Sequence, residues 1–102
     1  MELVEPFMAL VVYPTTPEAQ SRQADNLLKL ASDKFRLLPG FLRGRVFLSE
    51  DGQSLVTLTE WSDRESFQRF RDSEFGRAAT QVTAGLSPKA YWLRLHAAVE
   101  AP

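Results

Sequence analysis

Two stretches of alternating apolar and polar residues, separated by a tight-turn signal, constrain the fold of this chain most strongly. Residues 41–49 and 54–61 each alternate, and Asp51-Gly52 lies between them. An Asp-Gly pair between two alternating stretches is typical of a β-hairpin, because both residue types tolerate the positive φ that tight turns need. The centre of the chain is therefore predicted to be an antiparallel hairpin.

The segments that flank this hairpin predict a strand and a helix before it, and helices and a strand after it. The apolar run Phe7–Tyr13 predicts a strand, and apolar residues at spacings of three and four from Pro17 to Leu38 predict a helix. A capping box begins a second helix at Ser62, which restarts near Ser73, and Tyr91–Val99 predicts a last strand. The order βαββαβ is the ferredoxin-like plan of α+β proteins, a four-stranded antiparallel sheet with helices on one face.

Length and charge narrow the classes further. The 102 residues suit a single domain over residues 1–102. Twelve Lys and Arg against thirteen Asp and Glu give a net charge of −1, which removes the general attraction to phosphate backbones, so no nucleic acid is expected as a partner. Glu2 and Glu5 replace the basic start of a signal peptide, and the longest apolar run is too short to span a bilayer. We expect a cytoplasmic protein without a membrane partner.

The chain contains no cysteine and one histidine, His96. This composition excludes disulfides, thiolate nucleophiles, iron–sulfur clusters and sites built from several histidines, so no metal site is expected. His96 is the one side chain whose ordinary pKa lies near neutrality, which makes it a candidate general base. The alternative is an exposed histidine without a role.

One face of the predicted sheet needs a cover that two helices do not supply. In a monomer that face should be polar. Strict alternation in residues 41–48 instead groups aromatic and hydrogen-bonding residues on one face, namely Phe41, Arg43, Arg45 and Phe47. Large exposed aromatic faces are uncommon in monomers. We therefore expect a homodimer through the sheet face, in which the two sheets leave a small lined cavity.

The residues expected to line this cavity are aromatic and basic. Guanidinium groups there can hold an anionic oxygen of a small hydrophobic aromatic ligand, although exposed or salt-bridged arginines are the alternative. Tyr91 and Trp92 are neighbours in a strand, so only one of them faces the cavity. The candidate substrate-binding residues are Arg43, Arg45, Phe47, Tyr91, Trp92 and Arg94.

Several short motifs carry a resemblance to a known family. Leu38-Pro39-Gly40-Phe41 precedes the hairpin, Ser49-Glu50-Asp51-Gly52 forms its turn, and Trp61-Ser62-Asp63-Arg64-Glu65-Ser66-Phe67 follows it, with Phe70 beyond. In this order they resemble the antibiotic biosynthesis monooxygenase (ABM) family. That resemblance implies a dimeric ferredoxin-like α/β barrel. It also implies an oxidoreductase that oxidises polyketide phenols, anthrones or other small quinols without a cofactor.

The quinone-forming branch of that family carries an Asn-Tyr-x-x-Trp pattern, which the resemblance places on residues 57–61. Trp61 matches, and Thr57 stands at the asparagine position. Such a reaction needs no metal if the substrate's own enolate or phenolate gives an electron to dioxygen, while the protein favours the anion and excludes water. Thr57 can donate one hydrogen bond. The candidate catalytic residues are therefore Trp61, Thr57 and His96.

Two alternatives depend on the same comparison. A haem-degrading branch implies asparagine, tryptophan and histidine at positions that fall near Val11, Phe70 and Thr80, where none of these types stands; we expect no haem. The replaced asparagine leaves open a non-catalytic dimeric ligand-binding or interaction module on the same fold. Trp61 also has a structural alternative, because a large aromatic at a strand end usually seals a core.

Overall fold

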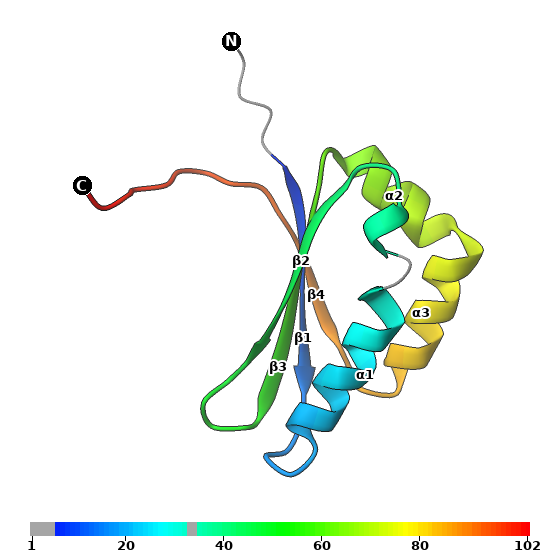
Figure 1. Cartoon of the computed structure of the whole chain (residues 1–102), viewed down its shortest axis with the longest axis vertical. Coiled ribbons are helices and arrows are strands. Elements are labelled where there is room, and N and C mark those ends of the chain that lie inside the picture. The colour runs from blue at the N-terminus through cyan, green and yellow to red at the C-terminus, as the bar shows by residue number, and fades with distance from the viewer. Residues whose placement is uncertain (1–5, 33–34) are drawn as a thin grey trace.

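The computed structural model describes residues 6–32 and 35–102. It confirms the order βαββαβ, with the second helical region divided in two (Figure 1). The predicted helix from Pro17 to Leu38 is shorter than expected, and residues 33–34 within it lie outside the described residues. The elements are β1 (Phe7–Pro14), α1 (Gln20–Ser32), the short 3-10 helix η1 (Phe35–Leu37), β2 (Phe41–Leu48), β3 (Ser54–Trp61), α2 (Arg64–Asp72), α3 (Glu74–Ala84) and β4 (Lys89–Leu93).

The four strands form one antiparallel sheet in the order β2-β3-β1-β4. The predicted hairpin is confirmed as β2 and β3, and Gly52 in its turn has a φ of 75°. All helices lie on one face of the sheet, and the other face is left open (Figure 1). None of the helices in the described residues is long and apolar enough to cross a membrane.

The last strand ends earlier than predicted. β4 stops at Leu93, so Arg94 and His96 do not belong to a strand, and residues 94–102 have no regular secondary structure. The cause is the length of its partner. β4 pairs with β1, in which Met8 is opposite Leu93, and β1 begins at Phe7, so it offers a partner to at most one residue after Leu93.

An irregularity in β2 changes which residues share a face. Phe41 is opposite Trp61 and Arg43 is opposite Glu60, so β2 has one extra residue, Leu42, at this point. Such a β-bulge shifts the alternation by one residue. Phe41 therefore faces the helices while Arg43 faces away, and the prediction that they share a face is wrong.

The core lies between the sheet and the helices in two adjoining clusters. One is centred on Trp61, which is 0% exposed and packs on Phe41, Phe67 and Phe70 at centroid distances of 5.3, 5.7 and 5.3 Å. The other is centred on Leu55, also 0% exposed. Burial of a large apolar side chain contributes about 1.5–3 kcal/mol, so these two residues anchor β3 to the helical layer.

The junctions before α2 and α3 are fixed by capping side chains. Asp63, not Ser62, caps α2, because its carboxylate accepts a 2.7 Å hydrogen bond from the amide of Ser66. Ser73 caps α3 by accepting from the amide of Gly76 at 3.0 Å. Asp and Ser are both preferred at this position. Together these caps satisfy backbone amides in the first turns of both helices and fix where each helix begins.

Candidate functional site

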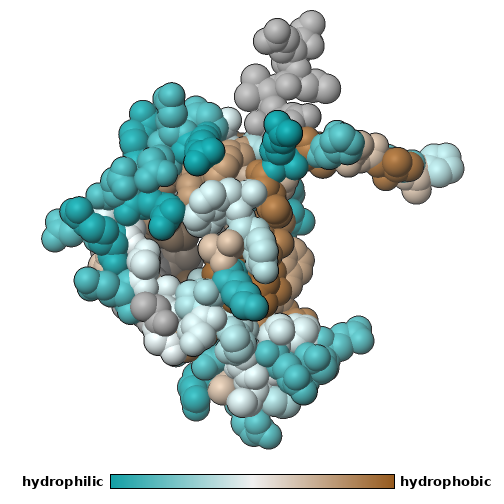
Figure 2. Space-filling view, turned by 180° about the vertical axis from the view of Figure 1, so that it is seen from behind, coloured by the Kyte–Doolittle hydropathy of each residue, from teal (hydrophilic) through white to brown (hydrophobic). Residues whose placement is uncertain are grey.

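A cavity of about 450 Å³ lies between the sheet and the helices. Figure 2 shows the surface hollowed at this place. Its floor is formed by the covered face of the sheet, and its walls come from α1, η1, α2 and α3. Most of its lining is apolar, supplied by residues that include Ala9, Val11, Leu27, Ala31, Phe35, Phe41, Val46, Phe67, Phe70, Ala90 and Trp92.

The polar atoms of the cavity are mainly hydroxyl groups. Those of Tyr13, Thr57 and Thr59 come from the floor, and those of Thr80 and Thr83 come from α3. β1 and β3 are paired so that Val11 is opposite Thr57 and Ala9 is opposite Thr59. These small neighbours on β1 leave the two threonine side chains accessible from the helical side.

Tyr13 is a buried residue of the cavity floor, on the same face of the sheet as Thr57 and Thr59. Burial raises the pKa of Tyr13 above its ordinary value of 10.0, and side-chain hydrogen bonds with Thr57 and Thr83 are smaller opposing influences. The phenol therefore stays protonated at neutral pH. It can donate or accept a hydrogen bond, but it cannot act as an anion in the cavity.

Trp61 and Thr59 are joined by a hydrogen bond in which the indole Nε1 donates to the threonine Oγ1 at 3.0 Å. Both side chains lie on the covered face, two residues apart on β3. Thr59 lines the cavity, whereas Trp61 is sealed beneath the phenylalanine cluster and does not. Trp61 thus reaches the cavity only through Thr59.

Three of the arginines that the structure describes border the cavity, and two of them, Arg36 and Arg71, lie away from the Arg45–Glu60 ion pair. Arg36 and Arg71 are exposed lining residues, and the Arg71 guanidinium lies 5.0 Å from the ring centre of Trp92. In the part of the chain that the structure describes, neither arginine has a carboxylate partner. Among the described residues that line the cavity there is no carboxylate and no histidine. The electrostatic character of the cavity therefore favours an anion.

Some of the residues predicted from the sequence meet at this cavity. Thr57 and Trp92 line it, and Trp92 also packs on Phe67 at 4.9 Å between ring centres. Arg45 borders it from the edge strand, but its guanidinium turns to Glu60 at 3.5 Å. The cavity lies under the helices, whereas the sequence predicts one between two sheets.

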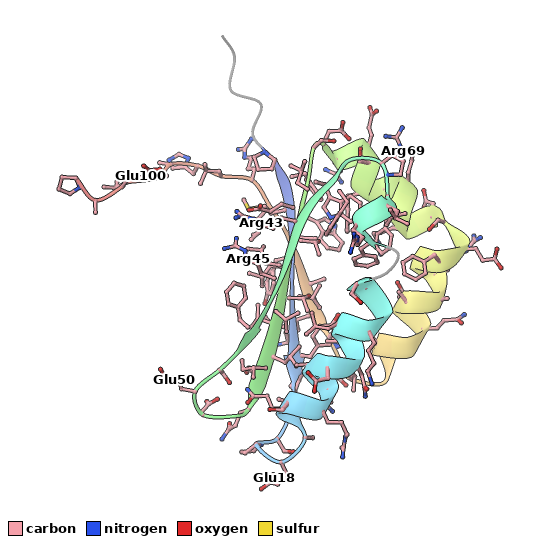
Figure 3. All side chains as sticks on the ribbon, viewed as in Figure 1. Glu18, Arg43, Arg45, Glu50, Arg69 and Glu100 are labelled. Carbon is pink, nitrogen blue, oxygen red and sulfur yellow. The ribbon has the colours of Figure 1, made fainter. Side chains whose placement is uncertain are left out.

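Other predicted residues lie elsewhere. Arg43, Phe47 and Tyr91 are on the face of the sheet that the helices leave open, and Figure 3 shows Arg43 and Arg45 pointing away from the helices. Arg94 and His96 are exposed in the segment after β4. The structure thus brings Thr57 and Trp92 together and separates them from His96, Arg43, Phe47, Tyr91 and Arg94.

Seven polar residues of the cavity described here are not among those predicted from the sequence, namely Tyr13, Ser32, Arg36, Thr59, Arg71, Thr80 and Thr83. Thr59 was detectable, because alternation places it on the same face as Thr57 and Trp61. The arginines were not, since they sit at helix ends where periodicity does not define a face. Within residues 6–32 and 35–102 no group of three or more His, Cys, Asp or Glu side chains is placed to hold a metal ion.

Comparison with solved structures supports this description of the fold. The monooxygenase from the gene ActVA-Orf6 of Streptomyces coelicolor, solved in complex with the ligand nanaomycin D, superposes with a TM-score of 0.70 and 25% identity over 96% of this chain and 94% of that one. SnoaB, a cofactor-independent oxygenase from Streptomyces nogalater, has a TM-score of 0.74 and 14% identity, with 94% and 98% of the chains covered.

Sequence comparisons point to the same group of proteins. Tetracenomycin-F1 monooxygenase of Streptomyces glaucescens is 31% identical over 62 residues, which are 61% of this chain and 55% of that relative. This chain thus matches about half the length of that enzyme. The model of the antibiotic biosynthesis monooxygenase family matches residues 6–81, three quarters of the chain. The chain therefore belongs to the antibiotic biosynthesis monooxygenase family.

Proposed function

We propose that this protein is a cofactor-independent monooxygenase that oxidises a small hydrophobic aromatic phenol, anthrone or quinol inside the cavity. The observation that carries the proposal is the composition of that cavity, an apolar volume of about 450 Å³ with hydroxyl groups on one side and, at its border, two guanidinium groups that have no carboxylate partner among the described residues. Ligand pockets of small molecules have this size and this combination of apolar walls and few polar groups.

The reaction balances with dioxygen as the only co-reactant. An anthrone CH₂ group loses a proton to give an enolate, which transfers one electron to dioxygen. The resulting radical and superoxide combine to form a C–O bond and, with a proton, a hydroperoxide. Loss of the second C–H proton, with cleavage of the O–O bond, gives the quinone carbonyl and water. Oxidation of CH₂ to C=O supplies the four electrons that reduce dioxygen, so no external reductant is needed.

The protein's part in this chemistry is to favour the anion. No carboxylate or histidine is among the lining residues described, so the substrate's acidic phenol or enol loses its proton to solvent before or during entry. Arg36 and Arg71 then attract the anion through their positive charges. The apolar walls exclude water, so that the guanidinium groups, and not solvent, stabilise the bound anion. Thr57, a candidate catalytic residue, and Trp92, a candidate substrate-binding residue, both line the cavity.

Related proteins support the reaction class. One similar enzyme is named for oxidation of tetracenomycin F1, and another structure contains nanaomycin D, a ligand of a monooxygenase. A third is described as a cofactor-independent oxygenase. These descriptions belong to those proteins, and the cavity described above gives the reason to extend the class to this one.

The proposal includes a second copy of the chain. The open face of the sheet carries Leu10, Leu58 and Tyr91 along neighbouring strands, together with Phe47 on the edge strand, and Phe47 and Tyr91 are 43% and 50% exposed. Figure 2 shows hydrophobic residues gathered over the sheet, on the side away from the helices. An apolar face of this kind favours burial against a partner, and a two-fold homodimer covers both copies at once.

The test is oxidation of a hydroxylated anthrone under isotopically labelled dioxygen, with the spontaneous rate measured beside it. A saturable rate above background, with one labelled oxygen in the quinone and one in water, supports the proposal. Arg71→Gln should raise KM for the anionic substrate several-fold, whereas Arg22→Gln, an exposed arginine outside the cavity, should not. Tight binding of the anthrone with no rate above background supports a non-catalytic binding module instead.

A further inference from the structure

We infer that the Thr59 hydroxyl is the hydrogen-bond donor that recognises an anionic oxygen of the ligand, and that Trp61 is the residue that positions it. This inference rests on the proposed function and deepens it, because it names the group that binds the phenolate or enolate. It assigns a role in recognition to a side chain, Trp61, that does not itself reach the cavity.

The first step is the fixed position of the indole. Trp61 is 0% exposed and is held by aromatic neighbours, including a stacked contact with Phe70 at 24° between ring planes. An indole N–H is a donor only, and when buried it needs an acceptor. The acceptor here is Thr59 Oγ1 at 3.0 Å. The packing of Trp61 therefore decides where the Thr59 oxygen lies.

The second step is the orientation of the Thr59 side chain. A hydroxyl has one hydrogen to donate and two lone pairs to accept. One lone pair of Thr59 receives the indole N–H, so the O–H hydrogen must point in another direction. The methyl carbon Cγ2 is turned toward Gly44 on β2, where an added Cβ would stand 3.8 Å from it. Among the residues described, the Thr59 hydroxyl makes no hydrogen bond other than the one that it accepts from Trp61.

The third step is elimination of the other hydroxyls in the cavity. Thr80 donates to the carbonyl of Gly76 at 2.9 Å, and Thr83 donates to the carbonyl of Ala79 at 3.1 Å. The Tyr13 phenol forms side-chain hydrogen bonds with Thr57 and Thr83, so the Thr57 hydroxyl already has a partner. On the floor of the cavity, Thr59 is thus the hydroxyl whose accepting side is occupied and whose hydrogen remains available.

These features make Thr59 suited to an anion. Accepting the indole N–H polarises the hydroxyl and strengthens it as a donor, because linked hydrogen bonds reinforce one another. A hydrogen bond to a charged oxygen is roughly twice as strong as a neutral one. The donor is also fixed before the ligand arrives, so little order has to be imposed on it when the ligand binds.

The experiment compares two probes that differ by one group, a monohydroxylated anthraquinone at a pH where its phenol is ionised, and unsubstituted anthraquinone. Thr59→Val removes the hydroxyl and keeps the shape. We expect about tenfold weaker binding of the ionised probe and unchanged binding of the unsubstituted one. Thr80→Val, the same substitution at a lining threonine whose hydrogen is already used, should change either affinity by less than threefold.

Trp61→Phe tests the positioning role. It keeps an aromatic ring in the core but removes the N–H donor, so it should weaken binding of the ionised probe as much as Thr59→Val does. The double variant should be no weaker than either single variant, because both act through one hydrogen bond. If Trp61→Phe loses affinity for both probes equally, the ring only supports the cavity wall. If the losses of affinity in the double variant are additive, Thr59 and Trp61 act separately.

A measurement without ligand keeps the inference testable if Trp61→Phe unfolds. The chain has two tryptophans, so its NMR spectrum contains two indole N–H signals. In the wild type one of them should exchange slowly with solvent, and Thr59→Val should shift that signal and speed its exchange. Discrimination between the probes without any oxidation would retain this inference and reject the proposed function. Normal oxidation by Thr59→Val, with undiminished binding of the ionised probe, would reject this inference and retain the proposed function.

Discussion

Arg43 binds Glu60 through two hydrogen bonds of 2.7 and 3.1 Å, across neighbouring strands on the open face of the sheet. Arg45 approaches the same carboxylate at 3.5 Å. The hydrogen bond from Arg43 is the main reason that the pKa of Glu60 lies below its ordinary value of 4.5. A charged cluster of Arg43, Arg45 and Glu60 therefore interrupts the apolar residues on this part of the open face.

This pair makes stability depend on pH in a defined sense. Because the native pKa of Glu60 is lowered, the folded carboxyl binds fewer protons than the unfolded one near its ordinary pKa of 4.5. The stabilisation is therefore present above that pH and is lost as the pH falls through the lower native value. Thermal unfolding at a series of pH values should show Glu60→Gln less stable than wild type at neutral pH, with the difference closing on acidification.

The control for this experiment is Glu18→Gln, an exposed glutamate without an ion-pair partner among the described residues. It should follow the wild-type curve at each pH. A gap between wild type and Glu60→Gln that widened toward low pH would contradict a lowered native pKa for Glu60.

Phe47→Asp should weaken self-association if the open face is the dimer interface. Phe47 is 43% exposed and lies on that face, so a carboxylate there would have to be desolvated on association. Leu37→Asp is the matched control, since Leu37 is 77% exposed in η1, away from the sheet. Sedimentation at several concentrations should show dissociation of the first variant only. Equal sedimentation of both variants would place the interface elsewhere.

Gly44→Ala should narrow the cavity without damage to the fold. The added Cβ would stand 3.4 Å from Phe41 Cζ and 3.8 Å from Thr59 Cγ2, which are distances that a packed core tolerates. Removal of a glycine from a strand also favours folding by roughly 0.5–1 kcal/mol. We expect unchanged or slightly higher Tm and several-fold weaker binding of anthraquinone. A lower Tm with unchanged binding would show that Gly44 serves packing and not access.

Gly76→Ala should be strongly destabilising. A Cβ at this position would lie 1.9 Å from the carbonyl oxygen of Phe70 and 3.1 Å from the Cα of Arg71, both backbone atoms. Relief requires movement of α2 against α3, at a cost on the order of 2–3 kcal/mol. Gly85→Ala is the comparison, because nothing lies within 4 Å of a Cβ there. Denaturant unfolding that found equal stability for both variants would refute the close approach of the two helices.

The fold was predictable because hydrophobic periodicity reports it directly. The alternation on both sides of Asp51-Gly52 defined β2 and β3, and the change from alternation to helical spacing defined the layers. The end of β4 was not predictable from its own residues. Leu95 and Val99 have strand character, but a strand needs a partner, and the antiparallel β1 begins at Phe7.

The site was predictable only in part. Each strand residue has to be assigned to the covered or the open face of the sheet before the residues that line a cavity can be named. Thr57 was named from the resemblance to the family pattern, and alternation allowed only one of Tyr91 and Trp92 to face the cavity; both Thr57 and Trp92 line it. Arg43 and Phe47 were assigned to the cavity from a face that the structure places on the outside. Tyr13, Arg36 and Arg71 depend on how α1, α2 and α3 lie over the sheet, and this arrangement is a property of tertiary packing.

The extra residue in β2 also affects how this chain should be compared with its relatives. Before Leu42 the odd-numbered positions of β2 face the helices, and after it the even-numbered positions do. A relative that lacks this residue keeps one parity throughout its strand. Alignments that place the gap only two or three positions away would equate inward with outward side chains, so the gap has to be set at Leu42 before any cavity residue of β2 is transferred between sequences.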